Sequence, residues 1–87
     1  MRELLVTSQF HKDLKTVPPK IKEQADALLF LLRENPVSAG LGIKKLKSVS
    51  PPAFRVRIGA YRLVYTFSLE QLILLRFRHR KDVYRNL

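Results

Sequence analysis

Apolar positions at helical spacing recur through the first third of the chain. Residues 2–6, Arg-Glu-Leu-Leu-Val, predict a short strand, and Thr7 or Ser8 follows as a hydroxyl residue suited to cap a helix. Phe10 and Leu14 come next, four residues apart and therefore on one face of a helix. The sequence thus predicts a strand that leads directly into a short amphipathic helix.

A second, longer helix is predicted between two proline signals. Pro18-Pro19 ends the first helical segment and opens the next, because proline is tolerated in the first turn of a helix. Asn35-Pro36 ends the second helix, because the residue before a proline is restricted to extended backbone. Residues 20–34 then form an amphipathic helix of about four turns. The simplest interpretation is two antiparallel helices joined at the prolines.

In the last third of the chain the apolar period changes to two, which is typical of half-buried strands. Residues 54–58 and 61–67 flank Gly59-Ala60, which suits a two-residue hairpin turn with glycine in the first central position. Residues 68–71 turn the chain again, and residues 72–78 form a third strand. Residues 54–78 are therefore predicted to form an antiparallel sheet.

Strand register decides which side chains share a face of that sheet. The two-residue turn pairs Arg57 with Arg62. For the second hairpin, an even loop would place Arg76 and Arg78 in the core, and burial of unpaired arginines is strongly destabilising. We therefore predict an odd loop, which leaves Arg62 beside Arg76. Its cross-strand pairs are Tyr61 with Phe77, Leu63 with Leu75, and Tyr65 with Ile73.

The predicted sheet has one apolar face and one basic face. The apolar face, suited to cover by the helices, consists of Phe54, Val56, Ile58, Tyr61, Leu63 and Tyr65. The basic face consists of Arg55, Arg57, Arg62, Arg76 and Arg78, with Arg80 continuing it. Like charges opposite one another destabilise a sheet, and the acids of this half, Glu70 and Asp82, cannot balance six arginines. The pattern indicates a polyanionic partner.

Together the elements predict an α+β fold, in which an N-terminal strand and a two-helix hairpin pack with an antiparallel sheet. The early strand is expected at the edge of that sheet. The length of 87 residues predicts a single domain that spans residues 1–87.

Charge is concentrated in the second half of the chain. Residues 1–43 carry six basic and five acidic side chains, and residues 44–87 carry eleven and two, which gives net charges of +1 and +9. Such a surface favours nucleic acid or an acidic protein segment as partner, with a solvated basic face as the alternative. The predicted loop at 37–52 adds Lys44, Lys45 and Lys47, for which a solvated connector and a phosphate contact both stay open.

Composition excludes several kinds of site. The chain has no cysteine, so disulfides and thiolate metal sites are excluded and a reducing compartment is natural. The histidines, His11 and His79, and the scattered acids form no metal-binding pattern, so we expect neither a metal nor a cofactor. The apolar run at 27–32 is too short to cross a bilayer, and the N-terminus does not have the pattern of a signal peptide. A soluble, cytoplasmic protein without membrane contact is expected.

Metal-free cleavage of RNA is the chemistry that remains, since RNA carries its own nucleophile, the 2′-hydroxyl. A protein assists by removing the hydroxyl proton, stabilising the phosphorane and protonating the leaving 5′-oxygen. Arginine suits the second task because its guanidinium matches phosphate oxygens. Tyr84 and His79 are the nearby candidates for proton transfer. Their alternatives are structural: Tyr84 as an anchor of the C-terminal turn, and His79 as a surface or capping residue.

Two stretches of the second half carry a resemblance to a known family. Residues 54–65, Phe-Arg-Val-Arg-Ile-Gly-Ala-Tyr-Arg-Leu-Val-Tyr, and residues 74–84, Leu-Leu-Arg-Phe-Arg-His-Arg-Lys-Asp-Val-Tyr, resemble the RelE/ParE toxin superfamily. The resemblance extends over essentially the whole chain, including the early strand and the helical hairpin. It implies the RelE-like fold and a toxin of a toxin–antitoxin system, with a cognate antitoxin as partner.

RelE-like toxins enter the ribosomal A site and cut messenger RNA without a metal, leaving a 2′,3′-cyclic phosphate. The resemblance implies this endoribonuclease activity here. Arg62 and Arg80 would stabilise the phosphorane, and Tyr84 would orient or deprotonate the 2′-hydroxyl or stack on a base. Because arginine stays protonated near neutral pH, His79 is added as a candidate for proton transfer. The expected RNA or phosphate contacts are Arg55, Arg57, Lys44, Lys45, Lys47, Arg76, Arg78 and Lys81.

Two other functions stay open from the sequence. ParE-like relatives share the fold but act on DNA gyrase, and generally lack the full set of basic residues with a C-terminal tyrosine. A basic RNA- or DNA-binding module without catalysis is the third interpretation.

Overall fold

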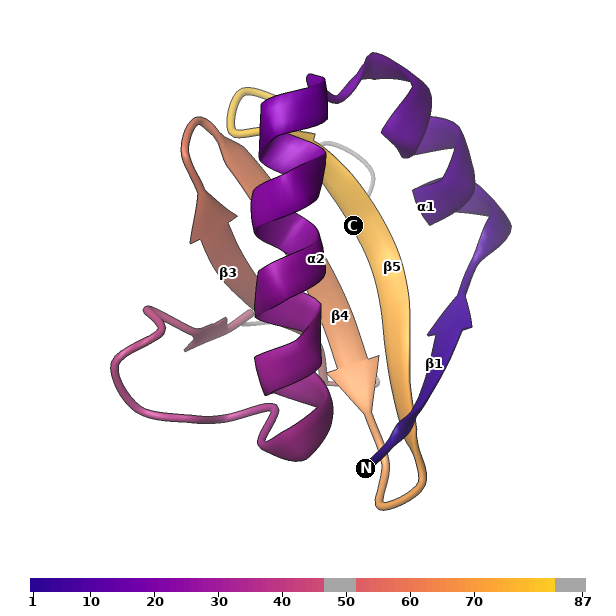
Figure 1. The fold of residues 1–87 in the computed structure, drawn as a ribbon, viewed down its shortest axis with the longest axis vertical. Helices are drawn as coiled ribbons and strands as arrows, with labels where there is room; N and C mark the ends of the chain where they lie inside the picture. The colour runs from indigo at the N-terminus through magenta and orange to yellow at the C-terminus, as the bar shows by residue number, and fades with distance from the viewer. Residues whose placement is uncertain (47–51, 83–87) are drawn as a thin grey trace.

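The computed structural model describes residues 1–46 and 52–82 of the chain (Figure 1). Its elements, in chain order, are β1 (Glu3–Val6), α1 (Ser8–Asp13), a 3₁₀ turn (Leu14–Thr16), α2 (Pro19–Glu34), β2 (Lys44–Lys45), β3 (Phe54–Ile58), β4 (Tyr61–Phe67) and β5 (Gln71–His79). The predicted α+β class is therefore confirmed. Within the described residues, no helix has the length and apolar character needed to span a membrane.

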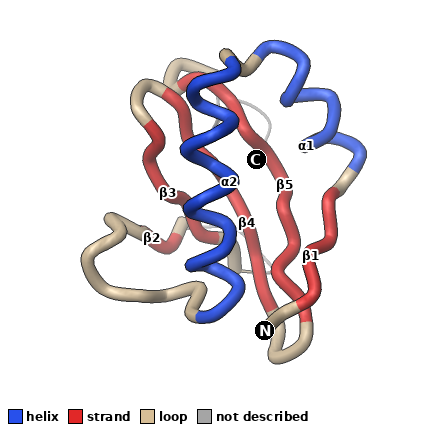
Figure 2. Tube along the Cα trace, in the orientation of Figure 1, coloured by secondary structure: helices blue, strands red, loops and turns tan. Residues whose placement is uncertain are grey.

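All the strands belong to one five-stranded sheet with the order β1-β5-β4-β3-β2 (Figure 2). β1 runs parallel to β5, and the other neighbours are antiparallel. The two helices run in opposite directions over the same face of the sheet (Figure 1). The prediction that the early strand joins the sheet at its edge is confirmed.

Local sequence signals explain where the helices begin. Thr7 caps α1, because its hydroxyl oxygen accepts the backbone N–H of Phe10 at 3.3 Å. The same hydroxyl donates to the carbonyl of Leu74 in β5 at 2.7 Å, which ties the start of α1 to the sheet. α2 begins at Pro19, where the fixed φ of proline suits the first helical turn. Both predicted helix starts therefore lie within one residue of the observed ones.

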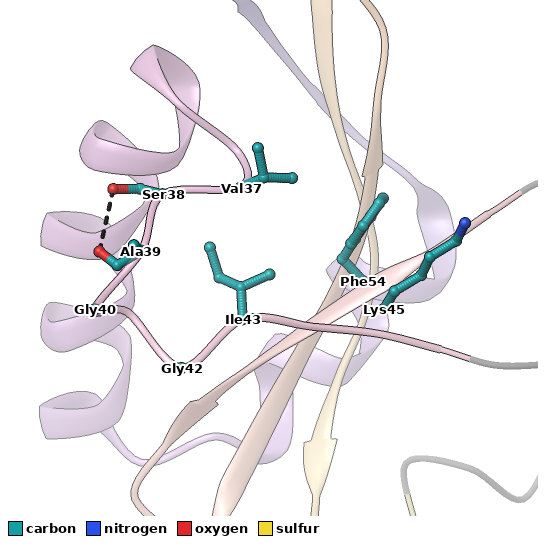
Figure 3. A pocket seen from close by; sticks show the side chains of 8 residues that line it. All are labelled: Val37, Ser38, Ala39, Gly40, Gly42, Ile43, Lys45 and Phe54. Carbon is teal, nitrogen blue, oxygen red and sulfur yellow. Dashed lines mark hydrogen bonds between the residues drawn. The ribbon is translucent and has the colours of Figure 1, made fainter.

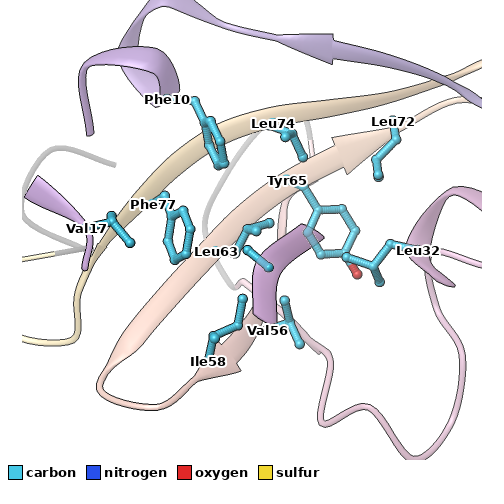
Figure 4. Packing of buried hydrophobic residues seen from close by; sticks show 11 residues of the cluster. Phe10, Val17, Leu32, Val56, Ile58, Leu63, Tyr65, Leu72, Leu74 and Phe77 are labelled. Atoms are coloured by element: carbon cyan, nitrogen blue, oxygen red, sulfur yellow. The ribbon is translucent and has the colours of Figure 1, made fainter. Parts of the chain in front are cut away.

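The core lies between the helices and the sheet (Figure 4). Phe10 of α1 stacks on Phe77 of β5, with ring centroids 5.6 Å apart. Leu32 of α2 is fully buried against the same layer. The predicted apolar face of the β3–β4 hairpin is confirmed, since it supplies Val56, Ile58, Leu63 and Tyr65 to this core. The Tyr65 hydroxyl donates to the Pro36 carbonyl, and burial raises the pKa of Tyr65.

The predicted register of the β4–β5 hairpin is wrong. Tyr61 lies opposite His79, not Phe77, and Arg62 lies opposite Arg78, not Arg76. The predicted pairs of Leu63 with Leu75 and of Tyr65 with Ile73 are likewise replaced by Leu63 with Phe77 and Tyr65 with Leu74.

A β-bulge at Leu75 is the physical reason. Phe67 pairs with Leu72 across an even loop, but the register shifts between Val64 and Tyr65, which leaves Leu75 as an extra residue in β5. A bulge reverses the alternation of side chains beyond it. Arg76 and Arg78 therefore leave the core despite the even loop. The odd-loop prediction assumed an uninterrupted alternation along β5.

Part of the predicted loop at 37–52 is a strand. The two residues of β2 pair with β3, so that Lys44 lies opposite Arg55 and Lys45 opposite Phe54. Leu46 continues this pairing by donating its N–H to the Ala53 carbonyl at 2.8 Å. On the sheet face away from the helices, Ala53 and Val64 form a second buried cluster with Leu46 and Leu75 packed against it. Two exposed lysines in so short a strand give no alternating apolar pattern to detect.

Candidate nucleic-acid interface

Arginines gather on the sheet face opposite the helices, which we call the arginine face: Arg55, Arg57, Arg62, Arg76 and Arg78. Arg57 of β3, Arg62 of β4 and Arg78 of β5 lie directly opposite one another in a single row. Residues paired in this way have Cβ atoms about 5 Å apart. The face thus concentrates positive charge across three neighbouring strands, as the sequence predicted.

Arg62 is held in place by the hairpin turn before it. Its Nη1 donates to the carbonyl of Gly59 at 3.2 Å and to that of Tyr61 at 3.0 Å. Gly59 has a φ of +60°, a left-handed conformation that glycine adopts without strain. Arg62 is 9% exposed. These contacts orient one guanidinium on the arginine face before any ligand arrives.

Arg55 lies in the neighbouring row, between Lys44 of β2 and Val64 of β4. It is 9% exposed, and its Nη1 is buried without a hydrogen-bond partner among the described residues. A buried donor left unpaired costs about 1–3 kcal/mol, and more when it is charged. An anion that reached Arg55 would relieve this cost. Arg57, two residues along the same strand, is exposed.

Arg76 is neutralised from within the protein. Its Nε and Nη2 donate to the two oxygens of Asp13 at 2.9 and 3.2 Å. The backbone N–H of Phe77 also donates to Asp13, at 2.9 Å. The sequence prediction considered only Glu70 and Asp82 as counter-charges, and missed this acid from α1. The charge of Arg76 is therefore matched by an acid of α1.

The residues after β5 return toward the hairpin turn. The backbone N–H of Arg80 donates to the Ala60 carbonyl at 2.8 Å, which brings Arg80 next to the turn that holds Arg62. Arg80 and Lys81 are exposed. Asp82 is tied back by its N–H to the His79 carbonyl at 2.8 Å. Arg62 and Arg80, grouped as phosphorane-stabilising residues from the sequence, are thus brought to the same end of the sheet.

His79 is not brought to the arginine face. It lies opposite Tyr61, and the two rings meet edge-on with centroids 5.5 Å apart. Its Nδ1 accepts the backbone N–H of Lys81 at 3.2 Å. Tyr61 belongs to the helix-covered side, where its hydroxyl donates to the Thr16 carbonyl. Alternation from Phe77 alone could have located His79 there, because residues two apart share a face.

The remaining predicted contacts divide between the two faces of the sheet, apart from two residues that the structure does not describe. Lys44 shares a face with Arg55, and Lys45 shares one with Phe54. Lys47 and Tyr84 lie outside the described residues. Asp13 and the strand β2 are the parts of the site that the sequence did not indicate. Asp13 and Arg76 are 63 residues apart, and no local pattern joins them.

In chemical terms, the described part of the arginine face offers fixed positive charge. Guanidinium groups can bind phosphate and stabilise charge that develops on it. Among the described residues, the titratable ring of His79 is on the opposite side of the sheet. His79 is therefore not placed to transfer a proton at this face.

Comparison with known proteins gives the family. Residues 4–84 match the family described as ParE toxin of type II toxin-antitoxin system, parDE. A protein of Methanocaldococcus jannaschii named "Putative toxin RelE1" is 33% identical over 78 residues, which cover 86% of this chain and 86% of that protein.

Solved structures are similar along nearly the whole chain. In the RelB-RelE antitoxin-toxin complex from Methanococcus jannaschii, the matching chain has a TM-score of 0.77 and 30% identity, and the alignment covers 92% of this chain and 94% of that one. YafQ from E. coli strain BL21(DE3) has a TM-score of 0.79 at 20% identity, with 97% and 99% covered, which shows the fold alone. With the match over residues 4–84, these findings establish that the chain belongs to the ParE toxin family of type II toxin–antitoxin systems, within the RelE/ParE superfamily.

Proposed function

We propose that this toxin is an endoribonuclease that cuts messenger RNA in the ribosomal A site, without a metal, and so blocks translation in the cytoplasm. The observation that carries the proposal is the row of Arg57, Arg62 and Arg78, with the backbone of Arg80 bonded to the nearby hairpin turn at Ala60. Like charges paired across strands destabilise a sheet. A phosphate backbone on this row would offset that repulsion, which favours RNA as the ligand.

The proposed reaction uses the nucleophile that RNA supplies. The 2′-oxygen forms a bond to phosphorus and loses its proton, the bond from phosphorus to the 5′-oxygen breaks, and the leaving oxygen takes up a proton. A 2′,3′-cyclic phosphate results. Arg62, preoriented by the Gly59 and Tyr61 carbonyls, and Arg80 would stabilise the phosphorane. Tyr84 would orient or deprotonate the 2′-hydroxyl. His79 contacts Tyr61 instead of this face, so we do not assign it the proton transfer.

Mapping of cuts in messenger RNA on translating ribosomes tests the proposal. We expect metal-independent cuts with the wild type and a fall of about a hundredfold or more with Arg62→Ala, because removal of one donor to a developing oxyanion has an effect of that order. Tyr84→Phe should also lower the rate. Lys12→Ala, an exposed change on α1, is the matched control and should retain activity. Cuts that survive Arg62→Ala unchanged would contradict the assignment.

Inhibition of DNA gyrase is the second candidate, favoured by the name of the matching family, which is that of a ParE toxin. The same preparations should be assayed for inhibition of DNA supercoiling. Inhibition without any cut in RNA would replace the first proposal with this one. Binding of RNA without cleavage or gyrase inhibition would leave a nucleic-acid-binding module.

A cognate antitoxin is the protein partner that we propose. The similar structures from Methanococcus jannaschii and Mycobacterium tuberculosis are complexes of a toxin with its antitoxin. A net charge of +10 favours an acidic or amphipathic antitoxin segment wrapped over the fold. Co-expression with the product of an adjacent small reading frame, followed by a growth assay, tests this part.

A further inference from the structure

A hollow lies beside the outer edge of the sheet at β2. β2 ends the strand order, with β3 as its neighbour. The hollow has a volume of about 310 Å³ and lies between this edge and the loop at 37–43. Figure 3 shows Val37, Ile43 and Phe54 pointing toward it, with Lys45 alongside Phe54. Since a water occupies roughly 30 Å³, the volume admits a large aliphatic or aromatic side chain.

The backbone of β2 can pair with a further extended segment. The Leu46 N–H donates inward to Ala53 of the sheet. In an antiparallel ladder, residues two apart direct their backbone groups to the same side, and the residue between them directs its own to the other side. Lys45 therefore turns its N–H and C=O away from β3, toward the open edge. A segment laid along this edge would bond to Lys45 and pass directly beside the hollow.

The charge at this edge selects an acidic segment. Lys44 and Lys45 are both exposed, and neither forms an ion pair with another described residue. They point to opposite faces, because Lys44 pairs with Arg55 and Lys45 with Phe54. Lys45 alone stands at the hollow, where a carboxylate two residues from an inserted apolar side chain, and so on the same face of the added strand, would meet its ammonium group.

We propose that the β2 edge and its hollow bind an extended acidic segment of a partner protein, with one large apolar side chain in the hollow and a carboxylate on Lys45. Lys44 then belongs with the arginine face, and Lys45 with a protein-binding site. The antitoxin proposed above is the partner expected to supply the segment, so the inference rests on that proposal for its partner. It does not rest on RNA cleavage.

Two adjacent lysines give a matched experiment, since Lys44→Ala and Lys45→Ala remove the same charge from opposite faces. The isotope-labelled full chain is titrated with a short synthetic peptide in which glutamate and leucine are two residues apart with serine between them, and separately with a short single-stranded RNA. We expect peptide-induced NMR shifts at residues 37–46 and 54. Lys45→Ala should weaken the peptide about tenfold and change RNA affinity by less than about twofold. Lys44→Ala should do the reverse.

Several outcomes would overturn the proposal. Equal losses of peptide affinity in both variants would mean that the peptide responds to net charge alone. Shifts centred on Arg57 and Arg78 would mean that the peptide imitates RNA on the arginine face. A loss of RNA affinity in Lys45→Ala would make Lys45 a phosphate contact, and undiminished binding of a serine-for-leucine peptide would show that the hollow is unused. Absence of peptide binding also refutes it. None of these results depends on whether the toxin cuts RNA.

Discussion

Removal of the Asp13 carboxylate should strongly destabilise the protein. In the fold, Asp13 accepts two bonds from Arg76 and one from the Phe77 N–H, and the two side chains are only 10% and 14% exposed. Asp13→Ala would leave a largely buried guanidinium and an N–H unpaired, a change that costs about 3–5 kcal/mol. At roughly 0.05–0.15 kcal/mol per residue, the whole chain has about 4–13 kcal/mol of stability. The loss is therefore a large fraction of the total.

Urea and thermal denaturation measure this loss. We expect the unfolding midpoint to fall by roughly 12–40 °C in Asp13→Ala. Asp26→Ala is the matched control, because Asp26 is an exposed carboxylate on α2 and its removal should stay within about 0.5 kcal/mol. The double variant Asp13→Leu/Arg76→Leu should recover much of the loss, since apolar replacement of both partners leaves no buried charge. A change below about 1 kcal/mol in Asp13→Ala would refute the reasoning.

Three further changes test other parts of the structure. Gly59→Ala should lower the free energy of unfolding by about 1–2 kcal/mol, because φ is +60° and the new Cβ would lie 3.3 Å from the Ile21 Cδ1. Gly59→Asn should lower it less, because asparagine adopts the left-handed conformation more readily. Burial raises the pKa of Tyr65 above its ordinary value of 10.0, so the contribution of this tyrosine to folding stability is complete below that pH and is lost as the pH rises further. Tyr65→Phe should therefore flatten the fall of the unfolding free energy at alkaline pH. An unchanged fall would contradict the burial argument. The salt dependence of single-stranded RNA affinity should weaken by about 0.7 in log–log slope for Arg57→Ala. The same slope should not change for Arg76→Gln, because Asp13 already matches the charge of Arg76 in the wild type. Equal changes of slope in both variants would argue against this internal neutralisation.

The parts of the fold that were predictable from the sequence rest on local signals. Pro18-Pro19 and Asn35-Pro36 bound α2, and its observed limits, Pro19–Glu34, follow from them. Gly59 and the alternation around it predict the β3–β4 hairpin with its register, including the pair of Arg57 with Arg62. In each case the deciding interaction joins residues a few positions apart.

What the sequence did not predict depends on distant or very short interactions. The Asp13–Arg76 pair joins α1 to β5, and its acid gave no sign of that partner within α1. β2 has only two residues, and both are exposed lysines. The side of the sheet on which His79 lies was available from alternation with Phe77, but the catalytic interpretation of His79 was based on its neighbours in sequence. The arginine face was predicted correctly although the β4–β5 register was not.

The extra residue in β5 also sets where the length of this strand can change. Deletion of Leu75 would join Leu74 directly to Arg76 and restore regular alternation, so that Leu74 and Phe77 would still face the helices and Arg78 would still face away. Loss of a single residue elsewhere in β5, such as Phe77, would turn every side chain beyond it to the wrong face. When related chains are aligned, a one-residue gap in the last strand is therefore best placed at position 75.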